Sequence, residues 1–231
     1  MLAGRVDPGS LRYTYNHDGF QGFHERPDQP ASARAVVKTH ARLDTLTERF
    51  PRFLTQQAFC RSDPRILIVR DPRDVAVSLF FYRYFRMPRV KNRWHARLPY
   101  TLRYPLMHGL FFGRVASAVA EEWSEFNEEW LKLDPILVRY RDLLDDAMGT
   151  LREVMEALAT PFMAEYARQA VEYCRFGSLR QREDRKFSPG AQNERFFRSG
   201  KRGSWQAHFS LRLLNEFDRL TGDLPARLGL Q

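Results

Sequence analysis

Cysteine is scarce in this chain: Cys60 and Cys174 are the two among 231 residues. This count excludes a scaffold held by several disulfides and falls short of a four-ligand zinc site, so both are expected to be small buried residues. The sequence also lacks a run of about 18 apolar residues, which argues against a membrane-spanning helix. Its first residues lack the apolar core of a signal peptide. We therefore expect a soluble, cytoplasmic protein.

Acidic residues are outnumbered, because 37 Lys and Arg against 28 Asp and Glu give a net charge of +9. Such an excess favours an anionic partner such as nucleic acid, acidic lipid, a sulfated glycan or a phosphorylated cofactor. The basic residues are spread along the chain, so nucleic-acid binding is the weaker interpretation. Hydrophobic residues make up 43% of the chain, enough for a buried core. No linker is visible, and we expect one domain over residues 1–231.

Short apolar runs alternate with helical patterns along the chain. The aliphatic run Ile66 to Val69 predicts a parallel strand that is covered on both faces. Aromatic, basic and glycine-rich composition predicts loops at 87–104 and 177–204. The alternation predicts an α/β fold with a parallel central sheet flanked by helices. The other predicted strands are 35–39 and 135–140, and the predicted helices are 72–84, 115–131, 143–158, 164–173 and 211–220.

Arg70 and Ser78 form a candidate anion site. Arg70 ends a predicted strand, Asp71-Pro72 can cap the next helix, and Ser78 lies about two turns into it. A helix N-terminus offers free amides and the positive end of the helix dipole, so an arginine and a hydroxyl there can hold a phosphate. On spacing alone, a surface ion pair for Arg70 and a plain surface serine remain open.

Lys38 and His40 form a candidate catalytic pair. They lie two residues apart at the end of a predicted strand, so they share a face. A cation offsets charge at a polyanionic reacting centre and lowers the pKa of a neighbouring histidine, which can then act as a base. On spacing alone, a structural histidine remains open.

Taken together, these motifs resemble the family of sulfotransferases that use 3'-phosphoadenylyl sulfate (PAPS). The segments that carry the resemblance are Lys38-Thr39-His40, then Ile68 to Ser78 (I-V-R-D-P-R-D-V-A-V-S), then 137–143, similar to a Y-E-D-L element, and 197–205, similar to an R-K-G-x-x-G-x-W loop. The resemblance implies a P-loop-like fold, PAPS as sulfuryl donor, PAP as product and no metal. It implies His40 as general base and Lys38 as the charge-stabilising residue. It implies a nucleotide site formed by Arg70, Ser78, Tyr140, Phe176, Arg198, Ser199 and Gly200.

The sequence departs from the family pattern in three places. Arg141 replaces the Glu of Y-E-D-L, and Ser199 replaces the Lys of R-K-G. Residues 1–37 hold no match to the P-K-x-G-T-T-W element, which cradles the 5'-phosphosulfate in the family, and no GxxxxGK[ST] of a nucleoside triphosphatase occurs. We therefore expect a sulfotransferase fold without its N-terminal strand and helix. The alternative function is a truncated, noncatalytic protein that binds PAPS or PAP.

The acceptor is less constrained than the nucleotide. We expect a hydroxyl or amine on a small molecule, a carbohydrate or a lipid. The aromatic and basic stretch 81–104 either lines an acceptor pocket or packs as core and lid, and both interpretations stay open. The oligomeric state stays open as well.

Overall fold

A computed structural model gives the structure of the protein and describes residues 12–14, 35–37, 64–86, 94–185 and 202–230. The chain divides into two units, residues 1–61 and 62–231. In the first unit, strand β1 (Arg12–Thr14) pairs in parallel with strand β2 (Ala35–Val37). The prediction of a strand beginning at residue 35 is confirmed.

The sheet of the second unit is a parallel pair of strands. Strand β3 (Ile66–Val69) lies beside strand β4 (Ile136–Arg139), and Val69 is the register partner of Arg139. Both strands fall on the apolar runs that predict them, and their parallel pairing agrees with the predicted α/β fold. Because the two strands end in register, residues 70 and 140 leave the sheet at the same edge.

Strand β3 is covered on one face and not on both. Leu67 and Val69 are buried, whereas Ile66 is 46% and Ile68 60% exposed. Successive side chains of a strand point to opposite faces, and helix α5 (Gly113–Leu131) packs against this strand. The prediction of cover on both faces is wrong, because in the described residues the helices bury only the face of Leu67 and Val69.

Helix α3 (Pro72–Phe81) begins where the sequence predicts. Asp71 is its N-cap, and the Asp71 carboxylate accepts a hydrogen bond of 2.9 Å from the amide of Arg73. Proline at the first helical position costs nothing, because its missing amide would have no partner inside the helix. The buried side of α3, which includes Phe80, packs against α5.

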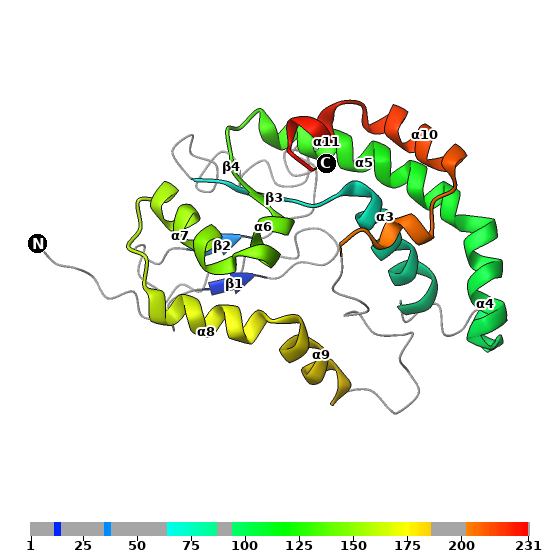
Figure 1. Ribbon diagram of the computed structural model, residues 1–231, viewed down its shortest axis with the longest axis horizontal. Helices are drawn as coiled ribbons and strands as arrows, with labels where there is room; N and C mark the ends of the chain where they lie inside the picture. The colour runs from blue at the N-terminus through cyan, green and yellow to red at the C-terminus, as the bar shows by residue number, and fades with distance from the viewer. Residues whose placement is uncertain (1–11, 15–34, 38–63, 87–93, 186–201, 231) are drawn as a thin grey trace, which may run out of the picture. The chain divides into compact units, whose positions relative to one another are not determined.

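Helix α5 lies between two other helices of the second unit, α3 and α10 (Leu211–Thr221) (Figure 1). Val119 and Trp123 are buried one helical turn apart, as the spacing of apolar residues predicts. The helices predicted at 115–131 and 211–220 are therefore confirmed, with ends that differ by one or two residues.

The remaining described elements are short. The π-helical turns are η2 (Tyr82–Arg86) and η5 (His108–Phe112), and the 3₁₀ turns are η4 (Trp94–Arg97) and η7 (Ser204–Ala207). The α-helices are α4 (Tyr100–Met107), α6 (Tyr140–Asp145), α7 (Ala147–Ala157), α8 (Ala164–Cys174), α9 (Phe176–Asp184) and α11 (Leu224–Arg227).

Two predicted loops contain helices. In α4, Arg103 and Met107 are buried one turn apart, so a helical period is hidden among the aromatic and basic residues of 87–104. Helix α9 consists largely of leucine, arginine, glutamine and acidic residues, most of which have high helix propensity. The predicted helix 143–158 is also divided, because Asp146 ends α6 and caps α7 by accepting a hydrogen bond from the amide of Gly149.

Cys174 is exposed at the end of α8, so the expectation of a buried residue is wrong there. None of the residues of α8 is fully buried, because the helix lies on the surface. Cys60 lies outside the described residues.

The C-terminal segment packs against the end of β4. Leu228 and Leu230 are buried, and the Nε of Arg139 donates a hydrogen bond of 2.7 Å to the carbonyl of Leu228. Gly229 has a φ of +68° and lies so close to this side chain that a Cβ would stand 2.9 Å from Nε. Glycine is therefore favoured there for two reasons, conformation and space.

Candidate functional site

The parallel pairing of β3 and β4 brings Arg70 and Tyr140 together. Each residue directly follows its strand, and the guanidinium carbon of Arg70 lies 4.9 Å from the centre of the Tyr140 ring. Both side chains are half-buried. The family resemblance implies that both residues bind the nucleotide, and the structure places them in contact at the carboxyl edge of the sheet, where ligands bind in open α/β folds.

The N-terminus of α3 lies beside this pair and carries a second arginine, Arg73. The Asp71 carboxylate accepts two hydrogen bonds of 2.9 Å from the Arg73 guanidinium. Burial lowers the pKa of Arg73, but the hydrogen bond to Asp71 and the charges of Asp71, Asp218 and Asp74 outweigh it, so the pKa is raised above its usual value. Arg73 is thus engaged within the protein.

Arg70 differs from Arg73 in its partners. Within the described part of the chain, no carboxylate forms an ion pair with Arg70. An unpaired, half-buried guanidinium next to the free amides of a helix N-terminus is a suitable site for an anion. A phosphate group fits this set of donors.

The other predicted site residues are distributed as follows. Ser78 is exposed on α3, and Phe176 is half-buried as the first residue of α9. The structure therefore brings two members of the predicted set, Arg70 and Tyr140, into direct contact. The predicted residues Lys38, His40, Arg198, Ser199 and Gly200 lie outside the described residues.

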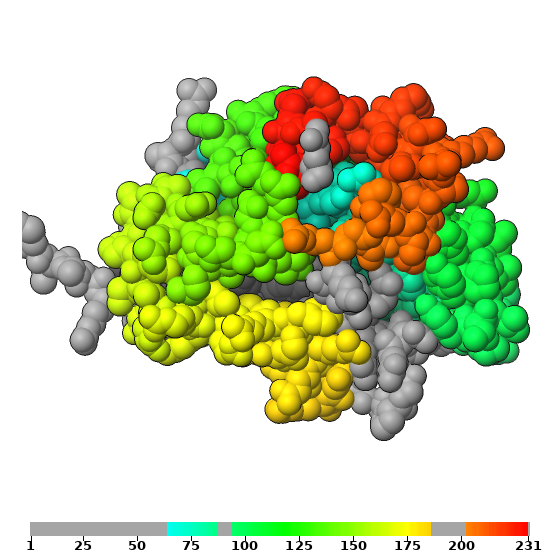
Figure 2. Space-filling model, in the orientation of Figure 1, coloured from blue at the N-terminus to red at the C-terminus, as the bar shows by residue number. Residues whose placement is uncertain are grey.

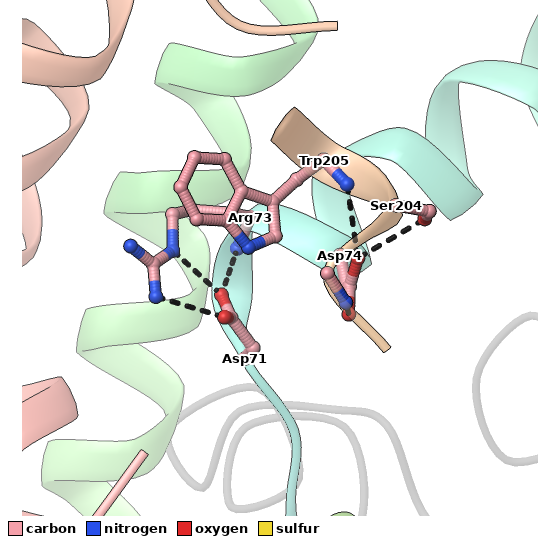
Figure 3. Close-up of polar contacts among 6 residues, drawn as sticks. Asp71, Arg73, Asp74, Ser204 and Trp205 are labelled. Carbon is pink, nitrogen blue, oxygen red and sulfur yellow. Dashed lines mark hydrogen bonds and ion pairs between the residues drawn. The ribbon is translucent and has the colours of Figure 1, made fainter. Parts of the chain in front are cut away.

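The sequence motifs do not reveal a role for Asp74, which lies in the first turn of α3. Asp74 is 3% exposed and accepts hydrogen bonds from the Gly203 amide at 3.0 Å, the Ser204 hydroxyl at 3.1 Å and the Trp205 amide at 3.3 Å. Figure 3 shows the bonds to Ser204 and Trp205. A buried aspartate needs such partners. Asp74 shares the buried side of α3 with Val77 and Phe81, and this helical spacing is the signal that could have pointed to a structural role.

Residues 202–205 form a turn, named here the 202–205 turn, that contacts both α3 and α6. Its last three residues contact Asp74, while the guanidinium of Arg202 forms an ion pair of 2.8 Å with Asp145 at the end of α6. In Figure 2 the orange residues run from the yellow-green surface of α6 to the teal α3. The turn therefore joins the helices that follow the two strands of the site. The guanidinium of Arg73 also stacks over the Trp205 ring, 4.2 Å from its centre.

The far end of α3 enters an aromatic cluster. Tyr104 stacks on Phe81 with ring centres 5.9 Å apart, and its hydroxyl lies 2.9 Å from Nδ1 of His208. Burial lowers the pKa of His108, although a hydrogen bond with the backbone of His208 acts in the opposite direction. We define the aromatic cluster as Phe80, Phe81, Tyr84, Phe85, Tyr104, His108, Phe112 and His208.

The stretch 81–104, for which pocket and core were both open, contributes to this cluster. Phe81 and Phe85 are buried, so these two side chains are part of the core. Trp94 is 62% and Tyr100 38% exposed, so neither of these two side chains is buried. The stretch thus combines core and surface positions.

Metal ligands and membrane spans were searched for in the same residues. Across the ranges that the structure describes, His, Cys, Asp and Glu side chains form no group of three or more that could hold a metal ion. No helix in those ranges combines the length and the apolar composition that crossing a membrane requires.

Comparison with known proteins places the chain among sulfotransferases. The protein-family model described as "Sulfotransferase domain" matches residues 19–229 of the chain. Sulfotransferase 2A1 of Rattus norvegicus is 21% identical over 183 residues, which cover 76% of this chain and 61% of the relative. The 3-alpha-hydroxysteroid sulfotransferase of Cavia porcellus is 24% identical over 184 residues, covering 75% and 60%. The chain thus spans about three fifths of the length of these relatives.

A solved structure shares the fold. Mouse sulfotransferase SULT7A1, crystallised in complex with PAP, superposes with a TM-score of 0.55 at 17% identity. The match covers 85% of this chain and 69% of the mouse protein. At this identity the likeness supports the fold, which is the helix-rich α/β architecture described above.

Proposed function

The chain belongs to the sulfotransferase domain family, and from this premise we propose that it transfers a sulfuryl group from PAPS to a hydroxyl or amine of an acceptor. One observation carries the proposal. Arg70 and Tyr140, which the motif matches assign to the nucleotide, lie in contact at the carboxyl edge of the parallel sheet. The in-register pairing of β3 and β4 brings the two residues to the edge at which ligands bind in open α/β folds, as a nucleotide site formed by both requires.

The donors at this edge suit the 3'-phosphate of PAPS. Arg70 has no carboxylate partner among the described residues, and the charge of Asp71 is offset by Arg73. A phosphate near Arg70 therefore meets a free guanidinium and the amides at the start of α3 rather than an exposed carboxylate. Ser78, Arg198, Ser199 and Gly200 complete the proposed phosphate contacts, and Tyr140 and Phe176 approach the nucleotide.

Catalysis is assigned to the two residues that follow β2. His40 takes the proton from the acceptor hydroxyl or amine, and Lys38 offsets negative charge on the sulfuryl and phosphate oxygens. PAPS supplies the sulfuryl group, whose bond to the 5'-phosphate oxygen breaks as the bond to the acceptor forms, leaving PAP. Positioning and charge stabilisation carry such a transfer, and the proposed mechanism uses no metal.

The first experiment is a calorimetric titration of the chain with PAP and, as the control without a 3'-phosphate, with 5'-AMP. We expect PAP to bind at least about tenfold more tightly, because a charge-assisted contact to the added phosphate is worth about 1.5–3 kcal/mol. Equal affinity for the two nucleotides would overturn the assignment of Arg70 to the 3'-phosphate. Transfer is tested by PAP release from PAPS with and without an acceptor.

The choice of acceptor for that assay follows from the relatives. One of them is named for 3-alpha-hydroxysteroids, so hydroxysteroids are the first acceptors to test, followed by phenols, sugars and lipids with free hydroxyls. A cytoplasmic location stays a prediction, and fractionation of the expressing cells would test it.

A noncatalytic PAPS- or PAP-binding protein is the second candidate. The two candidates differ in one result. A binding protein would prefer PAP to 5'-AMP and release no PAP from PAPS with any acceptor, whereas the proposed enzyme does both.

A further inference from the structure

The Asp74 carboxylate is buried, and its hydrogen-bond donors among the described residues are the consecutive residues Gly203, Ser204 and Trp205. One carboxylate oxygen accepts hydrogen bonds from the Ser204 hydroxyl and the Trp205 amide, and the other accepts from the Gly203 amide. Burial of a carboxylate is costly unless its oxygens are hydrogen-bonded, and both oxygens of Asp74 accept such bonds. The same bonds fix the 202–205 turn against the first turn of α3 (Figure 3).

The 202–205 turn is adapted to this carboxylate. Gly203 has a φ of +70°, a conformation that glycine adopts without strain. A turn with such a residue can direct more than one amide toward an anion, and here the Gly203 and Trp205 amides both point to Asp74. The turn has two further anchors, the stacking of Trp205 on Arg73 and the ion pair of Arg202 with Asp145.

The residues that anchor the turn, Asp74 and Asp145, lie close in the chain to the two residues of the proposed site, Arg70 and Tyr140. Arg70 precedes α3 by two residues, and Tyr140 is the first residue of α6. Gly203 follows Gly200, a proposed phosphate contact, by three residues in the sequence. The bond from Gly203 to Asp74 holds the turn at α3, the helix that follows Arg70.

We propose that Asp74 is a positioning residue for the 3'-phosphate of the nucleotide: by holding the 202–205 turn against α3, it sets the preference for a 3'-phosphorylated nucleotide without touching the nucleotide. The proposal rests on the proposed function. The proposed effect of Asp74 is opposite to that of its charge, because a carboxylate near a phosphate repels it. Asp74 therefore contributes through its hydrogen bonds. If repulsion dominated, removing the charge would raise the PAP affinity, whereas loss of the positioning bonds lowers it.

The test is the ratio of the PAP affinity to the 5'-AMP affinity in wild type and Asp74→Asn. The asparagine oxygen can still accept from Ser204 and Trp205, but its amide group would face the Gly203 amide, so that two donors oppose each other. We expect the PAP affinity to fall about tenfold and the 5'-AMP affinity to stay within about twofold. A purely structural role would lower both affinities together and leave the ratio unchanged.

The matched control is Ser210→Ala. The Ser210 hydroxyl accepts a hydrogen bond of 3.3 Å from the Leu213 amide and caps α10, five residues beyond Trp205. This variant removes an anchor of the same chain segment without touching Asp74, so we expect a lower melting temperature and an unchanged affinity ratio. An equal fall of the ratio in Ser210→Ala would overturn a specific role for Asp74.

The outcomes separate the two proposals. A wild-type chain without preference for PAP overturns the proposed function itself. A wild-type preference that a folded Asp74→Asn retains or increases overturns the positioning role alone. Where Asp74→Asn does not fold, Ser204→Ala, which removes one of the three bonds, decides: a smaller fall of the ratio supports the role, and an unchanged ratio overturns it.

Discussion

The two ends of helix α3 are held by different kinds of interaction. At its start, Asp71, Arg73 and Asp74 form directional hydrogen bonds and ion pairs with residues 2 to 131 positions away. At its end, Phe80 and Phe81 pack in the aromatic cluster. Directional bonds fix positions, whereas burial of apolar area stabilises the fold without dictating geometry at a distant site. One short helix therefore has a polar end that is suited to binding an anion and an aromatic end whose packing stabilises the fold.

The largest effect is expected at the aromatic end. Phe80 is fully buried and lies within 6 Å of the Phe81, Tyr84, Phe85, His108 and Phe112 rings. Phe80→Ala should lower the free energy of unfolding in urea by about 3–5 kcal/mol and leave the PAP to 5'-AMP affinity ratio of the folded protein unchanged. The control Leu102→Ala, at a residue 60% exposed, should cost less than about 1 kcal/mol. Equal losses of unfolding free energy in Phe80→Ala and Leu102→Ala would contradict the stabilising role of the aromatic end.

The next effect is expected at the polar end. Arg70→Met should weaken PAP binding by about 10- to 100-fold, because a charge-assisted contact to phosphate is lost. Stability should change little, since no described carboxylate pairs with Arg70. The control is Arg83→Met at an exposed position near the aromatic end. Calorimetry that finds the same PAP affinity in both variants would contradict the site.

A third test uses pH at the aromatic end. The lowered pKa of His108 means that the unfolded chain binds more protons just below the usual histidine pKa of 6.5. The free energy of unfolding should therefore fall as the pH drops through this range, down to the folded-state pKa. His108→Phe removes the titrating group, so urea titrations at pH 7.5 and 5.5 should differ less than in wild type. The same difference in both proteins would exclude this contribution.

The smallest effect is expected at the exposed anchor of the 202–205 turn. Arg202 and Asp145 pair at 2.8 Å, but each side chain is more than half exposed. Asp145→Asn should cost less than about 1 kcal/mol of stability, and that cost should shrink in 1 M salt. A loss as large as that of Phe80→Ala would show that the ion pair holds the turn more strongly than proposed, and a loss independent of salt would show that the charge of Asp145 is not its cause.

Much of the second unit follows from local patterns. The aliphatic runs at 66–69 and 136–139 are strands, and Asp71-Pro72 caps α3 as its sequence predicts. These features depend on neighbours in the chain, which is why they can be inferred without a structure. Helices α4 and α9 were not predicted, because aromatic, basic and glycine residues obscured their periodicity. For Lys38 and His40 the assignment still rests on the sequence alone.

The sequence by itself indicated the strands β2, β3 and β4, most of the long helices and the family motifs, and the resemblance to the family proposed Arg70 and Tyr140 as site residues. Only the tertiary structure decided that these two side chains touch, that Arg73 is occupied by Asp71 while Arg70 is not, and that Asp74 binds the 202–205 turn. The reason is physical. Capping and periodicity act over a few residues, whereas the register of β3 with β4 and the burial of Asp74 depend on residues about 70 and 130 positions apart.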